Sequence, residues 1–254
     1  MKNPKSILIT GGSSGLGEAL ALSYADKGVI LFLSGRNEER LRAVQNNCAA
    51  RGARIQVARI DSADEQKMSD WITACDKVAP LDLVVANAGI GAGFTTDMDL
   101  GEHTKKIFDV NVNGVFNCIH PAIRLMQPRG RGQIAIISSL AGYHGLPTAP
   151  AYSTSKVCVK GYGEALRGLY AQHGLEINVV CPGFVKSRLT ARNTFPMPFL
   201  METDKAAKAL RRGLEKNQAR ITFPWQLGLI YGAMVRFLPE GLFDKIFRVM
   251  PNKK

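Results

Sequence analysis

A tyrosine and a lysine four residues apart, Tyr152 and Lys156, are the side chains in this sequence best suited to moving a proton. On a helix this spacing puts both side chains on one face. A free phenol, with a pKa of about 10, is a poor proton shuttle at neutral pH, but a nearby ammonium lowers that pKa. Such a phenol can protonate a developing alkoxide or deprotonate an alcohol. Because tyrosine precedes lysine at this spacing often by chance, the pair needs supporting context.

Two serines provide part of that context. The apolar run Gln133–Ser138 (QIAIIS) is typical of a buried strand, and Ser139 follows it directly. A hydroxyl at the carboxyl end of a strand can donate a hydrogen bond to the oxygen of a substrate carbonyl. The alternative is that Ser138 and Ser139 are ordinary turn residues at a strand end.

A glycine-rich turn after the first apolar run indicates a binding function as well. The run Ser6–Thr10 (SILIT) leads into GGSSGLG, and a helical pattern follows. Glycine permits a sharp turn, lets the backbone approach a pyrophosphate, and lets the helix pack close to the strand. The free N–H groups at the helix start then face phosphates. Dinucleotide binding is therefore expected at the turn residues Gly11, Ser13, Ser14, Gly15, Leu16 and Gly17.

The residues after the second apolar run bear on the type of dinucleotide. A carboxylate at this place would hydrogen-bond the ribose hydroxyls of NAD, but the sequence reads Gly35, Arg36, Asn37. Arg36 offers a planar fork suited to a 2′-phosphate, although most arginines are solvated surface residues. We therefore expect NADP(H) to be favoured over NAD(H). Arg40, one turn further on, is expected to face solvent; the alternative is that it assists Arg36.

Two other strand ends carry candidate contacts. Asp61 and Ser62 follow the third run, where they are suited to cap a helix, to border an adenine pocket, or to do both. Asn87, Ala88 and Gly89 follow the fourth run, where small residues let the backbone pass close to a ribose. An ordinary strand-to-loop turn is the alternative there.

Short apolar runs alternate with longer amphipathic ones, and this alternation must position the candidates. The strands expected are Ser6–Thr10, Ile30–Ser34, Arg54–Ile60, Leu81–Ala86, Gln133–Ser138, Glu176–Cys181 and Arg220–Phe223. The helices expected are Gly15–Lys27, Glu38–Ala50, Ser62–Val78, Leu100–Met126, Tyr152–His173 and one after Phe223. This pattern predicts a single α/β domain over residues 1–254, a doubly wound, Rossmann-type parallel sheet of seven strands with helices on both faces. Such sheets bind ligands at the carboxyl ends of their strands, near the point where strand order reverses.

In order and spacing, the motifs resemble those of the short-chain dehydrogenase/reductase family, in its compact single-domain branch. The matching residues are Thr10-Gly-x-x-x-Gly15-x-Gly17, Asn87-Ala-Gly89, Asn111, Ser139, Tyr152-x-x-x-Lys156 and Pro182-Gly183, within about residues 5–190. The sequence departs from the family at Ala86, where a second asparagine is frequent; the departure affects a local hydrogen bond and not the activity.

The resemblance implies a role for each residue of the set. Tyr152 would be the general acid/base, Lys156 would lower its pKa and hold the nicotinamide ribose, and Ser139 would orient the substrate. Asn111 would lie at a break in its helix and hold a water that links Lys156 to solvent. The implied reaction is hydride transfer between NADP(H) and a carbonyl or secondary alcohol. Contacts near the nicotinamide are implied for Pro182, Gly183, Val185 and Ser187.

The family's substrate pocket is lined by the segments that follow the fifth and sixth strands. Here the second segment belongs to a lid expected over about residues 184–205, and it is rich in apolar side chains from Phe184 onward. This predicts an apolar, lipid-like or sugar-like substrate that contacts Ser139, Tyr152 and Phe184. The alternative is that the apolar side chains only pack the lid. Tyr143 and His144 are expected near the pocket.

Positive charge is concentrated at the C-terminal end. The net charge is +12, and the stretch from Lys205 onward holds eleven basic and three acidic residues. Within it, Ile221–Val235 is uncharged but too short for a comfortable membrane span. This basic and apolar extension, about residues 221–254, fits a helix packed on the core or at a subunit interface. It also fits peripheral contact with an anionic membrane.

Composition narrows the compartment and the partners. Five scattered cysteines, no signal-peptide pattern and no metal-ligand spacing are typical of a cytoplasmic protein without a metal centre. No nucleic-acid motif accompanies the charge, so we expect no nucleic-acid partner. We expect the protein to be a homodimer or homotetramer. Two alternatives are a non-catalytic NADP-binding regulator or scaffold and a nucleotide-sugar epimerase. The intact Asn111, Ser139, Tyr152 and Lys156 set argues against the first, and the lack of an extra substrate domain argues against the second.

Overall fold

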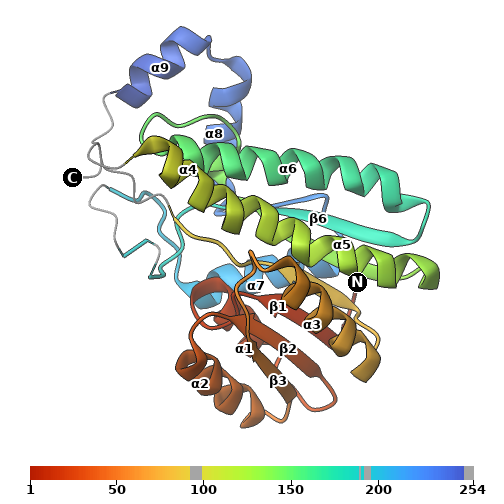
Figure 1. The fold of residues 1–254 in the computed structure, drawn as a ribbon. Helices are drawn as coiled ribbons and strands as arrows, with labels where there is room; N and C mark the ends of the chain where they lie inside the picture. Colours follow the sequence, from red (N-terminus) through yellow and green to blue (C-terminus); the bar gives the residue numbers. More distant parts are fainter. Residues whose placement is uncertain (92–98, 189, 192–195, 249–254) are drawn as a thin grey trace.

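Seven parallel strands form one sheet in the computed structural model, which describes residues 1–91, 99–188, 190–191 and 196–248 (Figure 1). The strand order is β3-β2-β1-β4-β5-β6-β7, so the order reverses between β1 and β4. The predicted doubly wound α/β sheet is thereby confirmed. The strands are β1 (Ser6–Thr10), β2 (Ile30–Gly35), β3 (Arg54–Arg59), β4 (Leu83–Ala86), β5 (Gly132–Ile137), β6 (Leu175–Pro182) and β7 (Arg220–Phe223).

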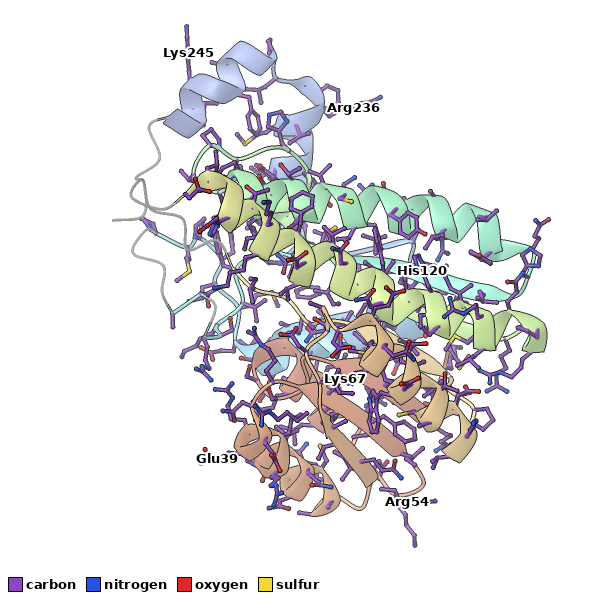
Figure 2. All side chains as sticks on the ribbon, in the orientation of Figure 1. Glu39, Arg54, Lys67, His120, Arg236 and Lys245 are labelled. Carbon is purple, nitrogen blue, oxygen red and sulfur yellow. The ribbon has the colours of Figure 1, made fainter. Side chains whose placement is uncertain are left out.

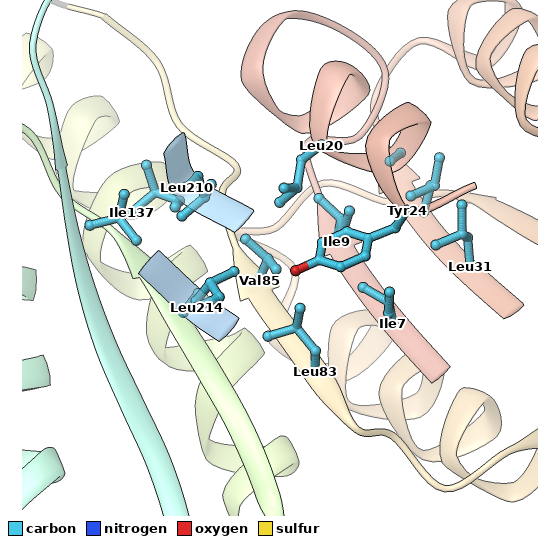
Figure 3. Packing of buried hydrophobic residues seen from close by; sticks show 14 of the residues in the cluster. Ile7, Ile9, Leu20, Tyr24, Leu31, Leu83, Val85, Ile137, Leu210 and Leu214 are labelled. Atoms are coloured by element: carbon cyan, nitrogen blue, oxygen red, sulfur yellow. The ribbon is translucent and has the colours of Figure 1, made fainter. Parts of the chain in front are cut away.

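Helices cover both faces of the sheet because successive strand residues point to opposite sides. Ile7 and Ile9 of β1 pack with α1, α2 and α7, whereas Leu8 packs with α3, α5 and α6. Figure 3 shows the first of these layers, in which Leu210 and Leu214 of α7 face the strands. The helices are α1 (Gly15–Tyr24), α2 (Glu38–Ala49), α3 (Glu65–Val78), α4 (Leu100–Phe108), α5 (Gly114–Met126), α6 (Pro150–Ala171), α7 (Thr203–Glu215), α8 (Trp225–Phe237) and α9 (Glu240–Arg248).

The helical pattern over Leu100–Met126 is divided into α4 and α5 by one turn of π-helix, Asp109–Asn113, which agrees with the break at Asn111 that the family resemblance implied. Two other expectations about helices were wrong. Helix α3 begins at Glu65 and not at Ser62, because Asp64 is its N-cap and accepts a hydrogen bond from the N–H of Lys67. Helix α7 was not predicted at all, and it includes the last residues of the segment expected to form a lid.

The third strand also differs from its expected character. β3 lies at the edge of the sheet, and its residues alternate between exposed and half-buried. Its sequence is therefore that of an edge strand with one covered face, and not of a strand buried on both faces.

The C-terminal helices α8 and α9 follow β7, the other edge strand, and rise away from the sheet (Figure 1). They lie on the opposite side of the molecule from α2. Among the helices of the described residues, none combines the length and the hydropathy that crossing a bilayer requires.

Candidate active site

A cleft of about 290 Å³ lies at the carboxyl ends of the strands, over the reversal between β1 and β4. Its walls come from the glycine-rich turn, the ends of β2, β4, β5 and β6, and the start of α6. Most predicted site residues line it, namely Gly11, Ser13, Ser14, Gly15, Leu16, Arg36, Asp61, Ser62, Asn87, Ala88, Gly89, Ser139, Tyr152, Lys156, Pro182, Gly183, Val185 and Ser187. Three predicted site residues, Gly17, Asn111 and Phe184, are not part of the lining.

The glycine-rich turn leaves no room for side chains where it meets neighbouring backbone. Gly11 has a φ of 63°, in the left-handed region that favours glycine. A Cβ there would lie 2.9 Å from Cα of Ala88. At Gly17 a Cβ would lie 2.5 Å from the carbonyl oxygen of Gly11. Gly17 therefore lets α1 pack against the turn, and its contribution to the cleft is indirect.

Hydrogen bonds from the end of β4 fix the shape of this turn. The Thr10 Oγ1 atom accepts from the N–H groups of Asn87 and Ala88, each at 3.0 Å. The Asn87 Nδ2 atom donates to the carbonyl oxygens of Thr10, at 2.9 Å, and of Gly11, at 3.2 Å. The amide group of Asn87 thus holds two loops together.

Two arginines face the cleft beyond the end of β2. Arg36 is exposed, and its Nη1 atom lies 3.8 Å from Oδ2 of Asp61, a pair that is too exposed and too long to fix either side chain. Arg40, on the first turn of α2, also lines the cleft. Its Nε atom is buried and has no hydrogen-bond partner among the described residues. The expectation that Arg40 faces solvent was therefore wrong.

Ser62 is buried against the start of α5. A Cβ on Gly114 would lie 2.7 Å from its Oγ atom, and Asn117 donates to its carbonyl oxygen at 3.0 Å. Asp61 accepts from the N–H of Ala63 at 3.1 Å. These contacts brace the loop between β3 and α3 where it borders the cleft.

Tyr152 and Lys156 lie on the first turns of α6, at the opposite end of the cleft from Arg36. The Lys156 Nζ atom is 5.8 Å from the centroid of the Tyr152 ring and donates to the carbonyl oxygen of Ile137 at 3.0 Å. Burial lowers the pKa of Lys156 to about 8. Burial raises the pKa of Tyr152, while a hydrogen bond with Ser139 acts in the opposite direction. The expected lowering of the tyrosine pKa is thus absent in the protein alone, because desolvation outweighs the hydrogen bond with Ser139.

The two serines after β5 have different partners. The Ser138 Oγ atom donates to the carbonyl oxygen of Lys156 at 2.7 Å, within the core. The Ser139 Oγ atom accepts from the N–H of Ala141 at 3.1 Å and lies 3.4 Å from the carbonyl oxygen of Pro182. Ser138 therefore attaches α6 to the sheet, whereas the Ser139 hydroxyl lies beside Tyr152 in the cleft.

Asn111 lies in the π-helical turn and is fully buried. Its Oδ1 atom accepts from the N–H of Ile90 at 2.8 Å, and its Nδ2 atom donates to the Ile90 carbonyl oxygen at 3.0 Å. A Cβ on Gly89 would lie 3.2 Å from Asn111 Oδ1 and 3.6 Å from Lys156 Nζ. Asn111 thus holds the loop after β4 directly behind the lysine.

Beyond β6, the chain folds back along the cleft wall. Val185 forms a bridge with Met201, and the buried Thr190 hydroxyl donates to the Val185 carbonyl oxygen at 2.8 Å and accepts from the N–H of Ser187 at 2.9 Å. Part of the predicted lid, residues 189 and 192–195, and the end of the C-terminal extension, residues 249–254, lie outside the described residues.

Tyr143 and His144 do not line the cleft, contrary to expectation. The Tyr143 hydroxyl lies 3.1 Å from Thr222 Oγ1, and its ring stacks on Tyr231. The His144 ring lies 4.0 Å from that of Phe243. Both residues hold α8 and α9 to the body of the protein.

Several residues of the lining were missed from the sequence, and they include Arg188 and Thr190. Thr190 gave no signal in the sequence, since its contribution depends on how the chain after β6 folds back. Arg40 was named from the sequence, but the expected outcome there was a side chain in solvent.

The chain matches the family model of short chain dehydrogenases over residues 5–196. It belongs to the short-chain dehydrogenase family. An uncharacterized oxidoreductase of Myxococcus xanthus is 39% identical over 245 residues, which cover 96% of each chain. The short-chain dehydrogenase from Sphingobium yanoikuyae in complex with NADPH has a TM-score of 0.80 at 19% identity, over 98% of this chain and 97% of that one. A short-chain dehydrogenase from Mycobacterium paratuberculosis bound to NAD has a TM-score of 0.76 at 23% identity, over 87% and 96%.

Membership of this family makes the protein an oxidoreductase that uses a nicotinamide dinucleotide and acts on a small molecule. The solved structures share its fold, and they include both an NADPH complex and an NAD complex. The identity of the preferred dinucleotide therefore has to be argued from the residues of this chain.

Proposed function

We propose that this short-chain dehydrogenase catalyses NADP(H)-dependent hydride transfer between the nicotinamide and a carbonyl or secondary alcohol. The observation that carries the proposal is the convergence of Ser139, Tyr152 and Lys156 at one end of a cleft. The glycine-rich turn and two arginines line the other end. A dinucleotide with its phosphates on the turn would reach the catalytic side chains.

The residues present fit such a dinucleotide. Glycines at positions 11 and 15 adopt positive φ and place no side chain at those two points of the turn, and the N–H groups at the start of α1 favour an anion. Arg36 and Arg40 supply cationic forks beyond β2, where the chain has no carboxylate until Glu38. A guanidinium suits a phosphate in charge and geometry. These features support NADP(H) over NAD(H).

When bound, NADPH supplies the hydride for carbonyl reduction. Ser139 and Tyr152 hold the carbonyl oxygen by donating hydrogen bonds, and they orient the carbon for attack. The Tyr152 hydroxyl gives its proton to that oxygen as the alcohol forms. Lys156 returns a proton to the phenolate and holds the nicotinamide ribose.

The environment of Tyr152 keeps it in the acid form. Because burial raises the pKa of Tyr152, the phenol is protonated at neutral pH and carries the proton that carbonyl reduction requires. Asn111 contributes to this proton path by holding neighbouring backbone in place. It fixes the π-helical turn and the loop at Ile90, and we propose that a water held there connects Lys156 to solvent.

We further propose an apolar, lipid-like or sugar-like substrate beneath the chain segment after β6. The exposed side chains of Phe199 and Leu200 in that segment support an apolar approach to the cleft. A cytoplasmic homodimer or homotetramer is part of the same proposal, and it is supported by the exposed Val157 and Leu169 on α6. Light scattering that finds only monomer would contradict the oligomer.

The test is consumption of NADPH and, in parallel, NADH by the wild-type protein across a panel of ketones and aldehydes. The expected result is turnover with apolar members of the panel and a higher kcat/KM with NADPH. Equal kcat/KM values with the two cofactors would contradict the assigned roles of Arg36 and Arg40. A complete absence of turnover across the panel would contradict the enzymatic function itself.

A further inference from the structure

One face of α8 is apolar, and no part of the chain that the structure describes buries it. The side chains of Trp225, Leu229 and Phe237 are 65%, 64% and 80% exposed, and Ile230 is 52% exposed. At helical spacing these residues fall on one side of the helix. The other side carries Leu227 and Tyr231, which pack on the cluster formed by Leu140, Val179 and Cys181.

Helix α9 continues this surface. Leu242 and Ile246 are one helical turn apart and both are exposed, whereas Phe243 turns inward against His144. We name the six exposed apolar side chains of the two helices the C-terminal apolar surface, which consists of Trp225, Leu229, Ile230, Phe237, Leu242 and Ile246. A surface of this kind on a soluble domain is typical of an interaction site.

The charge around the C-terminal apolar surface indicates the chemistry of its binding partner. Residues 216–239 contain Lys216, Arg220 and Arg236 and no acidic residue, and residues 216–254 together contain seven basic and two acidic residues. Arg220 is paired with Glu164, whereas Arg236 is exposed among the apolar side chains of α8. Figure 2 shows Arg236 and Lys245 projecting away from the body of the protein. Apolar side chains with basic neighbours match an anionic lipid headgroup layer over an acyl interior.

We propose that the C-terminal apolar surface docks the protein peripherally on membranes that contain anionic lipid. Helix α8 has 13 residues, so at 1.5 Å per residue it is about 20 Å long, well short of the ~30 Å hydrocarbon core. It therefore lies in the interface and does not span the bilayer. A symmetric contact between two copies would instead place each net positive surface against itself.

The docked orientation brings the cleft near the bilayer. Gly183, which lines the cleft, lies against Leu227 of α8, since a Cβ at position 183 would be 3.0 Å from its Cδ2 atom. Substrates dissolved in lipid would then have a short path to the cleft. This consequence rests on the proposed function, whereas membrane docking itself does not.

The experiment is co-sedimentation of the full chain with vesicles of phosphatidylcholine, alone or mixed with phosphatidylserine, at low and high salt. Wild-type protein should bind the mixed vesicles and lose that binding as salt screens the charge. The double variant Leu229→Gln, Phe237→Gln should bind at least tenfold more weakly, because both side chains lose apolar burial. Arg236→Gln should weaken binding to the mixed vesicles about fivefold. Val78→Gln, at a similarly exposed apolar position on α3, is the matched control and should bind like wild type.

Two further readouts keep the result clear. Thermal melting of each variant should give the Tm of the wild type, because these surface changes leave the fold intact. Trp225 fluorescence should shift to the blue on mixed vesicles, while Trp71, packed against Phe32, should not respond. The proposal would be overturned if the wild-type protein does not bind mixed vesicles, or if the double variant binds them as strongly as the wild type does. A dimer in lipid-free solution that the double variant abolishes would also overturn it, since the surface would then be a contact between copies. None of these outcomes depends on turnover.

Discussion

Lys156 is a cation in a place that solvates it poorly. Burial lowers its pKa to about 8, and its Nζ atom donates a hydrogen bond to the carbonyl oxygen of Ile137. Tyr152 is shifted in the opposite sense, because burial disfavours the phenolate. The pair therefore consists of a protonated phenol beside an ammonium whose pKa lies just above neutral pH.

The pH dependence of carbonyl reduction should follow Lys156. Below about pH 8 the lysine carries its proton and can return it to the phenolate, and above that pH it is neutral. We expect kcat/KM for reduction to fall as pH rises through about 8, because the raised pKa of Tyr152 keeps the phenol protonated over that range. In Lys156→Arg, whose guanidinium stays charged, the alkaline limb should move upward even if the maximum rate is lower. A wild-type profile that is flat across this range would contradict the role of Lys156.

Arg36 and Arg40 should share the recognition of the 2′-phosphate. Arg40→Gln should weaken NADPH binding about tenfold and leave NADH binding nearly unchanged, because a charge-assisted hydrogen bond contributes about 1.5–3 kcal/mol. Isothermal titration with both cofactors measures the difference. Arg42→Gln is a matched control, since that arginine points to Glu38 on the outer face of α2. Equal losses for NADPH and NADH in Arg40→Gln would contradict phosphate recognition.

At the residue scale, spacing and strand ends were enough to select Tyr152, Lys156 and the pair of Ser138 and Ser139. The family resemblance decided for Ser139 over Ser138. It also decided for Asn111 over Asn113, because both are weak helix formers in one helical pattern. The direction of the Tyr152 pKa could not be predicted, since it depends on how completely the surrounding elements exclude water. The burial of Arg40 depends in the same way on the angle between α2 and the sheet.

At the element scale, the glycine-rich turn can bind a dinucleotide because α1 begins in direct contact with it. Gly17→Ala should destabilise the fold by about 1–3 kcal/mol and weaken dinucleotide binding, because its Cβ would lie 2.5 Å from the Gly11 carbonyl oxygen. Gly161→Ala on α6 is the matched control. A Cβ there meets nothing within 4 Å, so alanine should stabilise that helix by about 0.5–1 kcal/mol. Denaturant unfolding of both variants measures the contrast, and a Gly17→Ala protein as stable as Gly161→Ala would refute the packing argument.

The buried strands were predictable because each is a short apolar run between turn signals. Two helical features were not. The π-helical turn at Asp109–Asn113 lies inside an apolar pattern that continues from α4 into α5, so periodicity alone gives no sign of the break. Helix α7 buries a narrow face of Ala206, Ala207, Leu210 and Leu214 within a mainly charged sequence, and the charge obscured it.

At the scale of the whole molecule, the sheet places two kinds of chemistry at the two ends of one cleft. The reversal of strand order between β1 and β4 opens the space for the dinucleotide. Helix α6 brings the proton-transfer residues Tyr152 and Lys156 to this cleft from the second half of the sequence. A sequence with alternating strands and helices predicts this arrangement, but it does not predict that α8 and α9 leave an apolar face uncovered.

Dinucleotide binding should stabilise the whole fold, because the two halves of the sheet meet at the cleft. At equal concentrations, NADPH should raise the Tm more than NADH does. A ligand at a hundred times its Kd contributes about 2.7 kcal/mol to the free energy of unfolding. Differential scanning fluorimetry measures both shifts. A larger shift with NADH would contradict the assigned cofactor preference.

The central claim is that Tyr152 transfers the proton in a nicotinamide-dependent reduction. The most direct measurement compares wild type and Tyr152→Phe in NADPH binding, followed by fluorescence, and in NADPH consumption with the best carbonyl of the panel. Removing only the hydroxyl should leave the Kd for NADPH within a few-fold and lower kcat by about 10²–10⁴, the usual contribution of a positioned general acid. A phenylalanine variant that turns over at the wild-type rate would contradict the account.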